Sequence, residues 1–551
     1  MSSINLENLT IPKSTNCRFL LSACPELESV TLPKNATFIH SMIFGECSKL
    51  KNVDIPDTVT TIGYGAFRGC TSLESITIPA SVETIGDSAF RQCKNLTDVN
   101  IQNDPTNTTS PASLKTIGPN AFKDCEKLKN INIPDSVTRI GESAFMSCTS
   151  LESLTLPDSV TRIENEAFAS CERLKNITIP DSVTYIEDEV FNGCTNLESI
   201  KLPESLENIY RNAFRECKKL ASITIPNGII VIDTGVFADC ENLKYVKLPD
   251  SLKKIAAVAF QNCRSLKNIT LPDTLKSIGD YAFSECTSLE SIELPLGATD
   301  IENFAFHQCK SLKSITIPNS VFIIGAHAFD GCESLENITL PDSITEIDSF
   351  VFHGCQSFKS MIIPDSVTAI HSDAFEKCSS LESIKIPESV DSIEWNAFKG
   401  CKKLTGITIP NGVTVISDSI FENCESLEHI KLPDSIDNIY NNTFAGCSSL
   451  EYITIPDAVK SIGSYAFSKC KSLENLEIPY GVTDIGFMAF YNCKNLKNIT
   501  IPTSLNYINS YAFSECESLE TVTIISDCTS KIIDVRELDL DTMDQWIFLY
   551  F

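Results

Sequence analysis

Cysteine recurs in this chain with a period that determines the class of fold. Of the 24 cysteines, all but Cys17 and Cys528 share one register from Cys24 to Cys516, at a spacing of 23 residues with a single exception. Relative to each cysteine, Leu usually stands at +3, aliphatic residues at +6 and +8, Pro at +9, apolar residues at +12 and +15, and Phe at +20. A fixed period of this length predicts a solenoid, because one unit cannot bury its apolar face alone and must stack on its neighbours.

Each repeat carries the pattern of a short strand followed by turns. The Pro at +9 ends the strand because it lacks an N–H group, and the Pro-Asp-Ser that often follows favours a turn. The apolar pair at +12 and +15 predicts a short second strand, and the Ala-Phe-x-x-Cys segment predicts a helical turn. The pattern predicts 23 stacked parallel strands, the first formed by Leu6, Leu9 and Ile11 and the last by Leu519, Val522 and Ile524.

The repeats predict one elongated domain with three regions. Residues 1–26 form an atypical N-terminal capping repeat, and residues 27–524 form the tandem 23-residue repeats. A nine-residue insertion within residues 102–112 is polar and contains Pro, so we expect a loop there. Residues 525–551 form a C-terminal cap or a docking tail, of which we favour the cap.

The charge of the chain argues against a nucleic-acid partner. The net charge is −28, whereas binding to phosphates requires a basic stripe. The longest apolar run, residues 546–551, is far shorter than the ~20 residues that cross a bilayer, so we expect no transmembrane segment. The first residues already follow the repeat pattern, and we see no secretory leader or lipid anchor.

Two residue types could suggest metal or redox sites. The periodic cysteines lack the C-x-x-C pairs typical of zinc sites, so we interpret them as reduced, buried thiols, with Cys17 and Cys528 as the more reactive ones. The histidines are expected to be a scattered, solvent-facing set: His40, His307, His327, His353, His371 and His429. Without a nucleophile elbow, a phosphate-binding glycine loop or a zinc-helix motif, we predict no enzymatic activity, cofactor or metal.

One string connects these repeats with a known family. The string L-x-x-I-x-I-P-x-S-V-x-x-I-G-x-x-A-F-x-x-C, present at residues 73–93 and 128–148, resembles the repeat of the BspA-like leucine-rich repeat family over nearly the whole chain. The resemblance implies a right-handed leucine-rich-repeat solenoid of the α/β repeat class, with turns, short second strands and helical turns on the convex side. It also implies a non-catalytic surface antigen or adhesin that binds host or extracellular-matrix proteins at the cell surface.

The expected binding surface is the outer side of the first strand of each repeat. The +5 and +7 side chains must point away from the core, because side chains alternate along a strand. Large +5 residues are rare among the Ser and Asn that dominate this position, and aromatic residues often anchor interfaces. The candidate protein-binding residues are Tyr245, Lys247, Lys385, His429, Lys431 and Tyr452, and Glu394 and Trp395 are expected on the opposite face.

Two functions therefore follow from the sequence. The first is a cell-surface adhesin whose sheet face engages a host or matrix protein through many shallow contacts. The alternative is an intracellular scaffold of the same fold, located in the cytoplasm, which the absence of a visible leader and the reduced cysteines favour.

Overall fold

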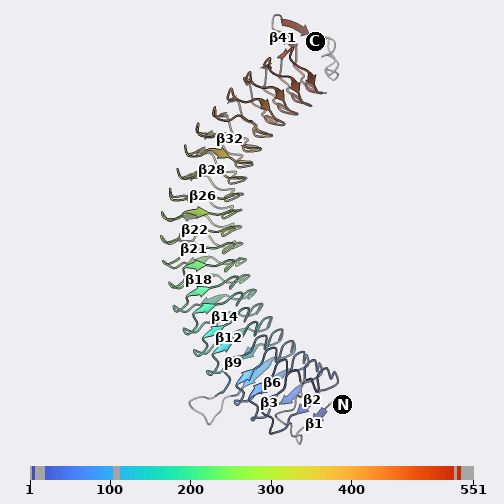
Figure 1. Cartoon of the computed structure of the whole chain (residues 1–551), viewed down its shortest axis with the longest axis vertical. Helices are drawn as coiled ribbons and strands as arrows, with labels where there is room; N and C mark the ends of the chain where they lie inside the picture. Colours follow the sequence, from blue (N-terminus) through green and yellow to red (C-terminus); the bar gives the residue numbers. More distant parts are fainter. Residues whose placement is uncertain (1–2, 6–18, 103–111, 510, 526–529, 535–551) are drawn as a thin grey trace. The chain divides into compact units, whose positions relative to one another are not determined.

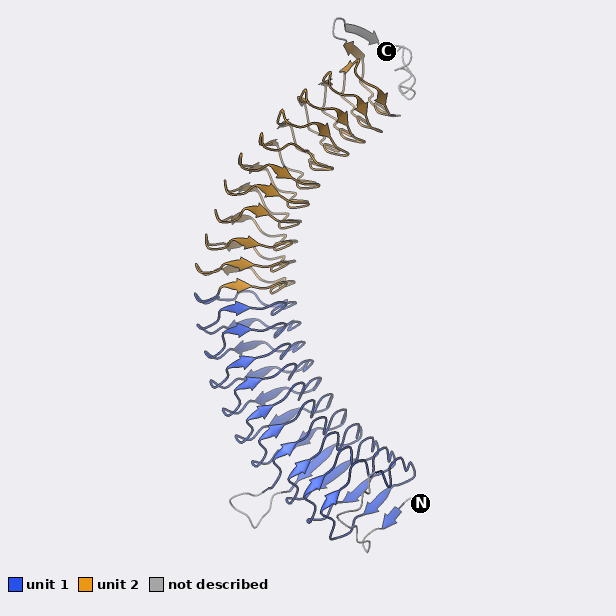
Figure 2. Ribbon diagram, viewed as in Figure 1, with its two compact units in different colours: residues 1–275 blue, residues 276–551 orange. Residues whose placement is uncertain are grey.

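The computed structural model describes residues 3–5, 19–102, 112–509, 511–525 and 530–534. The chain divides into two compact units, residues 1–275 and 276–551, and each unit is a stack of successive turns of chain (Figures 1 and 2). The predicted insertion lies almost entirely outside the described residues. The same holds for Cys17, Cys528 and the chain after residue 534.

A single turn shows how the sequence makes the fold. The strand β6, Ser75–Ile78, exposes Ser75 and Thr77 and buries Ile76 and Ile78. Pro79 ends the strand, and the Pro79 carbonyl accepts a hydrogen bond from the Val82 N–H at 3.1 Å, which closes a turn. Two further residues form the second strand, β7, Thr84–Ile85, before the chain returns to the next cysteine. The predicted alternation of inward and outward side chains is therefore confirmed in the structure.

In residues 1–275 the strands form two parallel ladders. The first ladder consists of β1 Ser3–Asn5, β2 Ser29–Thr31, β4 Asn52–Asp54, β6 Ser75–Ile78, β8 Asp98–Ile101, β10 Asn130–Ile131, β12 Ser153–Thr155, β14 Asn176–Thr178, β16 Ser199–Lys201, β18 Ser222–Thr224 and β20 Tyr245–Lys247. The second consists of β3 Phe38–Ile39, β5 Thr61–Ile62, β7 Thr84–Ile85, β9 Thr116–Ile117, β11 Arg139–Ile140, β13 Arg162–Ile163, β15 Tyr185–Ile186, β17 Asn208–Ile209, β19 Val231–Ile232 and β21 Lys254–Ile255.

Residues 276–551 repeat this arrangement. The first ladder consists of β23 Ser291–Glu293, β25 Ser314–Thr316, β27 Asn337–Thr339, β29 Ser360–Ile362, β31 Ser383–Lys385, β33 Gly406–Thr408, β34 His429–Lys431, β37 Asn475–Glu477, β39 Asn498–Pro502 and β41 Thr521–Ile525. The second consists of β22 Ser277–Ile278, β24 Asp300–Ile301, β26 Ile323–Ile324, β28 Glu346–Ile347, β30 Ala369–Ile370, β32 Ser392–Ile393, β35 Asn438–Ile439, β36 Ser461–Ile462, β38 Asp484–Ile485 and β40 Tyr507–Ile508.

The two ends of the first ladder depart from the repeat. Ile4 of β1 pairs with Val30 of β2, so β1 fills the pairing position predicted for Leu6, Leu9 and Ile11, which lie outside the described residues. At the other end, β42, Ser530–Asp534, pairs with β41 in the antiparallel direction. This hairpin covers the edge of the last parallel strand, which would otherwise be free to pair with another chain.

The predicted helical turns are wrong, because the described residues contain strands and turns and no helix. Residues 120–125 show why. Asn120, Phe122 and Asp124 donate their N–H groups to carbonyls of the next turn of the solenoid, at 2.7–2.9 Å. The residues between them, Ala121, Lys123 and Cys125, donate within their own turn to the carbonyl three residues earlier. A helix would need every N–H to reach the carbonyl four residues earlier, so the turn-to-turn bonds exclude it.

Phenylalanine and cysteine form the centre of each unit. The buried rings stack turn upon turn, with centroids 5.4 Å apart for Phe44 and Phe67 and 5.5 Å for Phe283 and Phe306. From Cys70 onward the buried thiols typically point at the Phe carbonyl of the preceding turn, as Cys70 does with Phe44 at 3.2 Å, whereas Cys47 points at the Leu21 carbonyl. The described cysteines are free, and all except Cys24 are buried, which confirms the predicted thiols. Burial raises the pKa of the Cys93 and Cys194 thiols to about 12, so these thiols stay protonated.

The thiol ladder predicts the reactivity of the whole chain. Without reductant, we expect few thiols of the native protein to react with an aromatic disulfide reagent, because buried, protonated thiols are poor nucleophiles. After unfolding in denaturant, nearly all 24 cysteines should react. Absorbance of the released thiolate measures both numbers. A large deficit in the unfolded protein would show that the cysteines are oxidised.

The shared core predicts unequal effects of two substitutions in one turn. Ile292 of β23 is 3% exposed, so Ile292→Asp should bury an unpaired carboxylate and lower the free energy of unfolding by about 4 kcal/mol. Glu290→Lys reverses the charge of an exposed side chain and should cost less than about 1 kcal/mol. Chemical denaturation of both variants measures the difference, and equal losses would contradict the inward and outward assignment.

Candidate functional site

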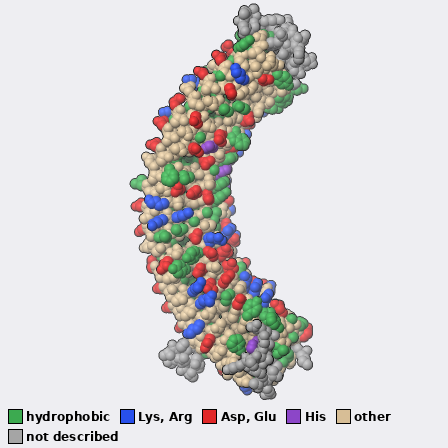
Figure 3. Space-filling model, viewed as in Figure 1, with side chains coloured by type: hydrophobic (Ala, Val, Ile, Leu, Met, Phe, Trp, Pro, Cys, Tyr) green, Lys and Arg blue, Asp and Glu red, His purple; other side chains and the backbone are tan. Residues whose placement is uncertain are grey.

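The outward +5 and +7 side chains of the first ladder form a surface that we call the sheet face. The candidate residues lie on it: Tyr245 and Tyr452 are 58% and 62% exposed, and His429 and Lys431 lie exposed on either side of the buried Ile430. Acidic and basic side chains are interspersed over the face of the molecule drawn in Figure 3. Ser, Asn and Thr predominate at the +5 and +7 positions, so the sheet face is polar, with a few large side chains.

Four of the candidate residues lie together in residues 276–551. Lys385 ends β31, the neighbouring strand β33 follows, and β34 carries His429 and Lys431. The parallel register places Thr408 beside Lys431, and a bridge pairs His429 with Tyr452 on the next strand. Lys385, Thr408 and Lys431 therefore form a row across three strands, with Tyr452 beyond His429.

Gly406 makes this part of the sheet face concave. Lys385, Gly406, Thr408, His429 and Lys431 line an open hollow of about 390 Å³, which we call the cationic hollow. A Cβ atom on Gly406 would lie 2.7 Å from the His429 Nε2 atom, so the imidazole occupies the space that a side chain at this position would fill. Most other repeats carry Ser or Asn at the equivalent +5 position, so the glycine is what allows the His429 imidazole to lie over this strand at the edge of the hollow.

The other two candidates, Tyr245 and Lys247, belong to residues 1–275. They lie on β20, where Tyr245 pairs with Ser222 and Lys247 pairs with Thr224 of β18. On the other side of β18, Lys201 ends β16. This second row, Lys201, Thr224 and Lys247, repeats the chemistry of Lys385, Thr408 and Lys431, but a serine stands where the cationic hollow has Gly406. The candidate residues thus form two separate groups, one in each unit.

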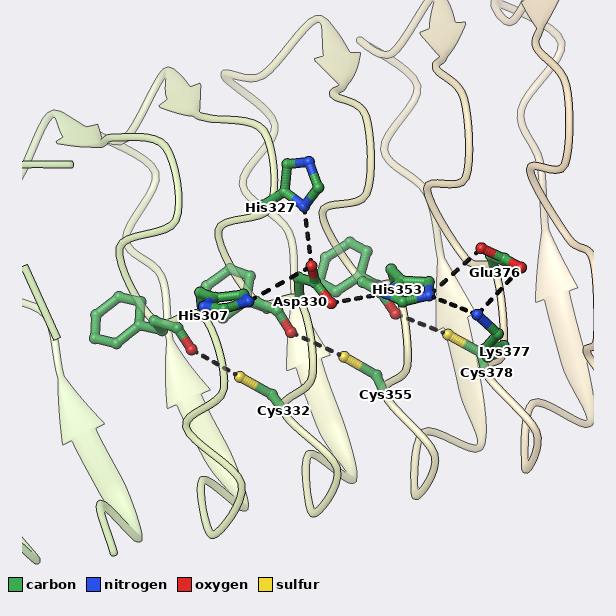
Figure 4. Close-up of polar contacts among 12 residues, drawn as sticks. His307, His327, Asp330, Cys332, His353, Cys355, Glu376, Lys377 and Cys378 are labelled. Carbon is green, nitrogen blue, oxygen red and sulfur yellow. Dashed lines mark hydrogen bonds and ion pairs between the residues drawn. The ribbon is translucent and has the colours of Figure 1, made fainter. Parts of the chain in front are cut away.

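The histidines form a network that the sequence analysis missed. The carboxylate of Asp330 lies 2.9 Å from His327 Nδ1, 2.7 Å from His353 Nδ1 and 3.9 Å from His307 Nε2 (Figure 4). On its other side, His353 Nε2 lies 3.4 Å from a Glu376 oxygen. The expectation of a scattered, solvent-facing set is wrong for these three histidines, because their side chains are only 23–26% exposed and contact one carboxylate.

A signal for this network was present in the sequence. His307, Asp330, His353 and Glu376 occupy one repeat position in four consecutive turns, so bases and acids alternate along the column. His327 comes from a different column, in which the rings of Tyr281, Phe304, His327 and Phe350 stack at centroid distances of 4.2–4.4 Å. Comparing all residue types at one position, and not histidines alone, would have found the first column.

The network shifts the pKa values of Asp330 and His307. Burial alone would raise the pKa of Asp330, but hydrogen bonds from His353 and His327 outweigh it and hold that pKa below its usual value. Burial lowers the pKa of His307 more than Asp330 raises it. Across the described ranges, no group of three or more His, Cys, Asp or Glu side chains has an arrangement that could hold a metal ion.

A separate histidine bridges two glutamates in the same unit. His371 lies 3.0 Å from Glu394 and 3.1 Å from Glu346. Burial opposes the charge on His371, but the hydrogen bonds to Glu394 and Glu346 outweigh it and raise the pKa of His371. Glu394 also accepts hydrogen bonds from the N–H and hydroxyl groups of Ser372. Replacing Glu394 would therefore disturb several contacts, so it is unsuitable as a neutral control on the face opposite the candidate residues.

Comparisons with known proteins agree with the repeat pattern. Overlapping stretches of the chain, residues 17–112, 104–221, 207–332, 299–428 and 414–533, match the profile described as the BspA type leucine rich repeat region, six copies. No curated protein matches the chain. Within its described residues, the structure has no helix that is long and apolar enough to cross a membrane.

Several solved structures are similar to this chain. A leucine-rich repeat protein from Bacteroides ovatus is 32% identical, with 70% of this chain and 82% of that chain covered and a TM-score of 0.37. A leucine rich cell surface protein from Faecalibacterium prausnitzii is 28% identical, with 73% and 87% covered and a TM-score of 0.37. The pneumococcal vaccine antigen PcpA is 22% identical, with 67% and 84% covered and the same TM-score.

The shifted histidines predict opposite dependences of stability on pH. A raised pKa in the folded state means that His371 stabilises the fold below its ordinary pKa of 6.5 and loses this effect as the pH rises through the folded value. His371→Gln should therefore cost about 0.5–1 kcal/mol in acid and less in base. His307, whose pKa is lowered, costs stability as the pH falls, so His307→Gln should become relatively more stable in acid.

Urea denaturation of both variants and the wild type, in mildly acidic and mildly basic buffer, measures these differences. The two variants serve as controls for each other, because both replace a partly buried histidine with glutamine in the same unit. Parallel pH profiles for the two variants would contradict the assigned directions of the pKa shifts.

Proposed function

Because this chain belongs to the BspA-type leucine-rich repeat family, we propose that it is a non-enzymatic protein-binding protein that engages its ligand through the sheet face. The observation that carries the proposal is the group formed by Lys385, His429, Lys431 and Tyr452 around a hollow in the sheet. Exposed tyrosines are enriched at the centres of protein interfaces, where they often act as anchors, and the lysines around Tyr452 can add electrostatic complementarity to a partner. The long row of polar +5 and +7 side chains supplies further shallow contacts around it.

The proposed role is that of a cell-surface antigen or adhesin that binds host or matrix proteins. The relative from Faecalibacterium prausnitzii is described as a cell surface protein, which supports this location for the present chain. The alternative is an intracellular interaction scaffold of the same fold. The free cysteines favour it, because reduced thiols persist in a reducing compartment. Antibody staining of unpermeabilised and permeabilised cells separates the two locations.

A double substitution tests the sheet face. Tyr452→Ala with Lys431→Ala should weaken binding to cultured host cells or to immobilised matrix proteins by tenfold or more, because aromatic anchors contribute about 2 kcal/mol or more each. Both side chains are exposed, so the melting temperature should change little. Flow cytometry and surface plasmon resonance measure the binding.

The matched control is Trp395→Ala with Lys469→Ala, which removes one exposed aromatic residue and one exposed lysine from the turns that follow the second ladder. This control should bind as the wild type does. If the control abolishes binding while the Tyr452 and Lys431 variant binds normally, the ligand contacts the turns and the sheet-face proposal fails.

A further inference from the structure

The two lysines of the cationic hollow lie on an open surface of an acidic chain. Some lysines in the turns pair with glutamates one repeat away, as Lys402 does with Glu425 at 3.0 Å and Lys310 with Glu333 at 2.9 Å. Among the described residues, Lys385 and Lys431 have no such partner. The chain carries 72 acidic and 44 basic residues, and in this hollow two lysines without an ion-pair partner in the described part of the chain line one open surface.

The spacing of these lysines suits a carboxylate. Lys385 and Lys431 are two strand steps apart, roughly 10 Å, with Thr408 between them. A carboxylate above Thr408 would lie about 5 Å from each strand that carries a lysine, within reach of both flexible ammonium groups, and the threonine hydroxyl could donate a further hydrogen bond. The acidic residues nearest along the chain stand three residues before or after each lysine: Glu382 and Glu388 for Lys385, and Glu428 and Asp434 for Lys431. None of them forms an ion pair with its lysine in the described structure.

The hollow provides the volume for such a group. Its size, about 390 Å³, is near the lower end for ligand sites, which suits one or two side chains of a partner and not an entire domain. The floor is formed by Gly406 and the wall by the His429 imidazole, while Tyr452 lies beyond His429 on the next strand. An extended segment crossing the ladder would place a carboxylate between the lysines and its neighbouring residues against these two rings.

We propose that the cationic hollow is a recognition site for an extended, acidic segment of a partner protein, with a glutamate or aspartate carboxylate held between Lys385 and Lys431. This inference rests on the proposed protein-binding function and specifies the chemistry of the ligand. Charge complementarity favours this occupant. A second copy of this acidic chain would bring its negative surface against the negative surface around the hollow, whereas a short acidic segment would contact the two lysines alone.

The second lysine row provides an internal control. Lys201 and Lys247 flank Thr224 in residues 1–275 with the same spacing in strands, and Tyr245 stands at the +5 position beside them. Ser222 occupies the position of Gly406, so this row has the charges without the glycine. A ligand that requires only positive charge would use both rows equally, whereas a ligand that enters the hollow would use only the row around Gly406.

The test measures binding of a fluorescent peptide of alternating glutamate and threonine to the full chain by anisotropy. Lys385→Ala with Lys431→Ala should lower the affinity about tenfold or more, because charge-assisted hydrogen bonds are lost. Gly406→Ser should lower it by a similar factor without changing the charge. Lys201→Ala with Lys247→Ala should leave the affinity within about twofold of wild type, and the glutamine analogue of the peptide should not bind.

Each outcome is decisive. The inference is overturned if the two lysine pairs lose affinity equally, if Gly406→Ser binds as the wild type does, or if the glutamine peptide binds as well as the glutamate peptide. If the Gly406→Ser variant does not fold, combining it with His429→Ala removes the clash between the new side chain and the imidazole. The comparison of the two double-lysine variants still tests the inference.

Failure of this inference can be told apart from failure of the proposed function. Should the wild type bind host cells or matrix proteins while the Lys385 and Lys431 variant binds them equally well, the protein-binding function stands and the acidic ligand is wrong. Should the wild type bind neither cells, matrix proteins nor the peptide, both fail.

Discussion

The alternation of hydrogen bonds between turns is the constraint on which the rest of this structure depends. At each Phe-x-x-Cys segment, every second N–H leaves its own turn for the next one, and the cysteine thiol adds a bond to the turn before. A turn therefore cannot satisfy its own polar groups, just as it cannot bury its own apolar face. Both needs are met only by a neighbour, which explains why the fold is built from many copies of one unit.

This bonding has a conformational cost that the stack offsets. Residues such as Glu166 and Val258 adopt positive φ values of 57° and 52°, in the left-handed region that non-glycine residues avoid by about 1–2 kcal/mol. Glu166 donates its N–H to Asp188 of the next turn at 2.9 Å. The left-handed residues direct their N–H groups towards the next turn. The conformational strain is therefore a consequence of forming the hydrogen bonds between turns.

The regular interior leaves the sheet face free to vary. Because strands of the first ladder are held by backbone bonds and by inward side chains, the outward +5 and +7 residues can change without loss of the fold. Gly406 illustrates this freedom: the strand retains its register with β34, yet the missing side chain makes room for the His429 imidazole at the hollow beside Lys385 and Lys431. The column that joins His307, Asp330, His353 and Glu376 arises in the same way on the turns, where identical positions in successive turns become neighbours in space.

The amino-acid sequence alone determined the period, the strand positions, the inward residues and the buried thiols, because each follows from a pattern within one repeat or between adjacent repeats. It also located Lys385, His429, Lys431 and Tyr452 on one surface, since alternation along a strand fixes side-chain direction. Only the tertiary structure showed that the segments between the second strand and the cysteine form turns and not helices. The Ala-Phe-x-x-Cys segment has a composition typical of helices. Residues such as Val258 adopt a left-handed conformation although they are not glycine, so the sequence does not reveal the turn or its hydrogen bonds to the next turn. The approach of three histidines to Asp330 was likewise decided in space, because His327 comes from a different repeat position than His307 and His353, and only stacking brings the two columns together.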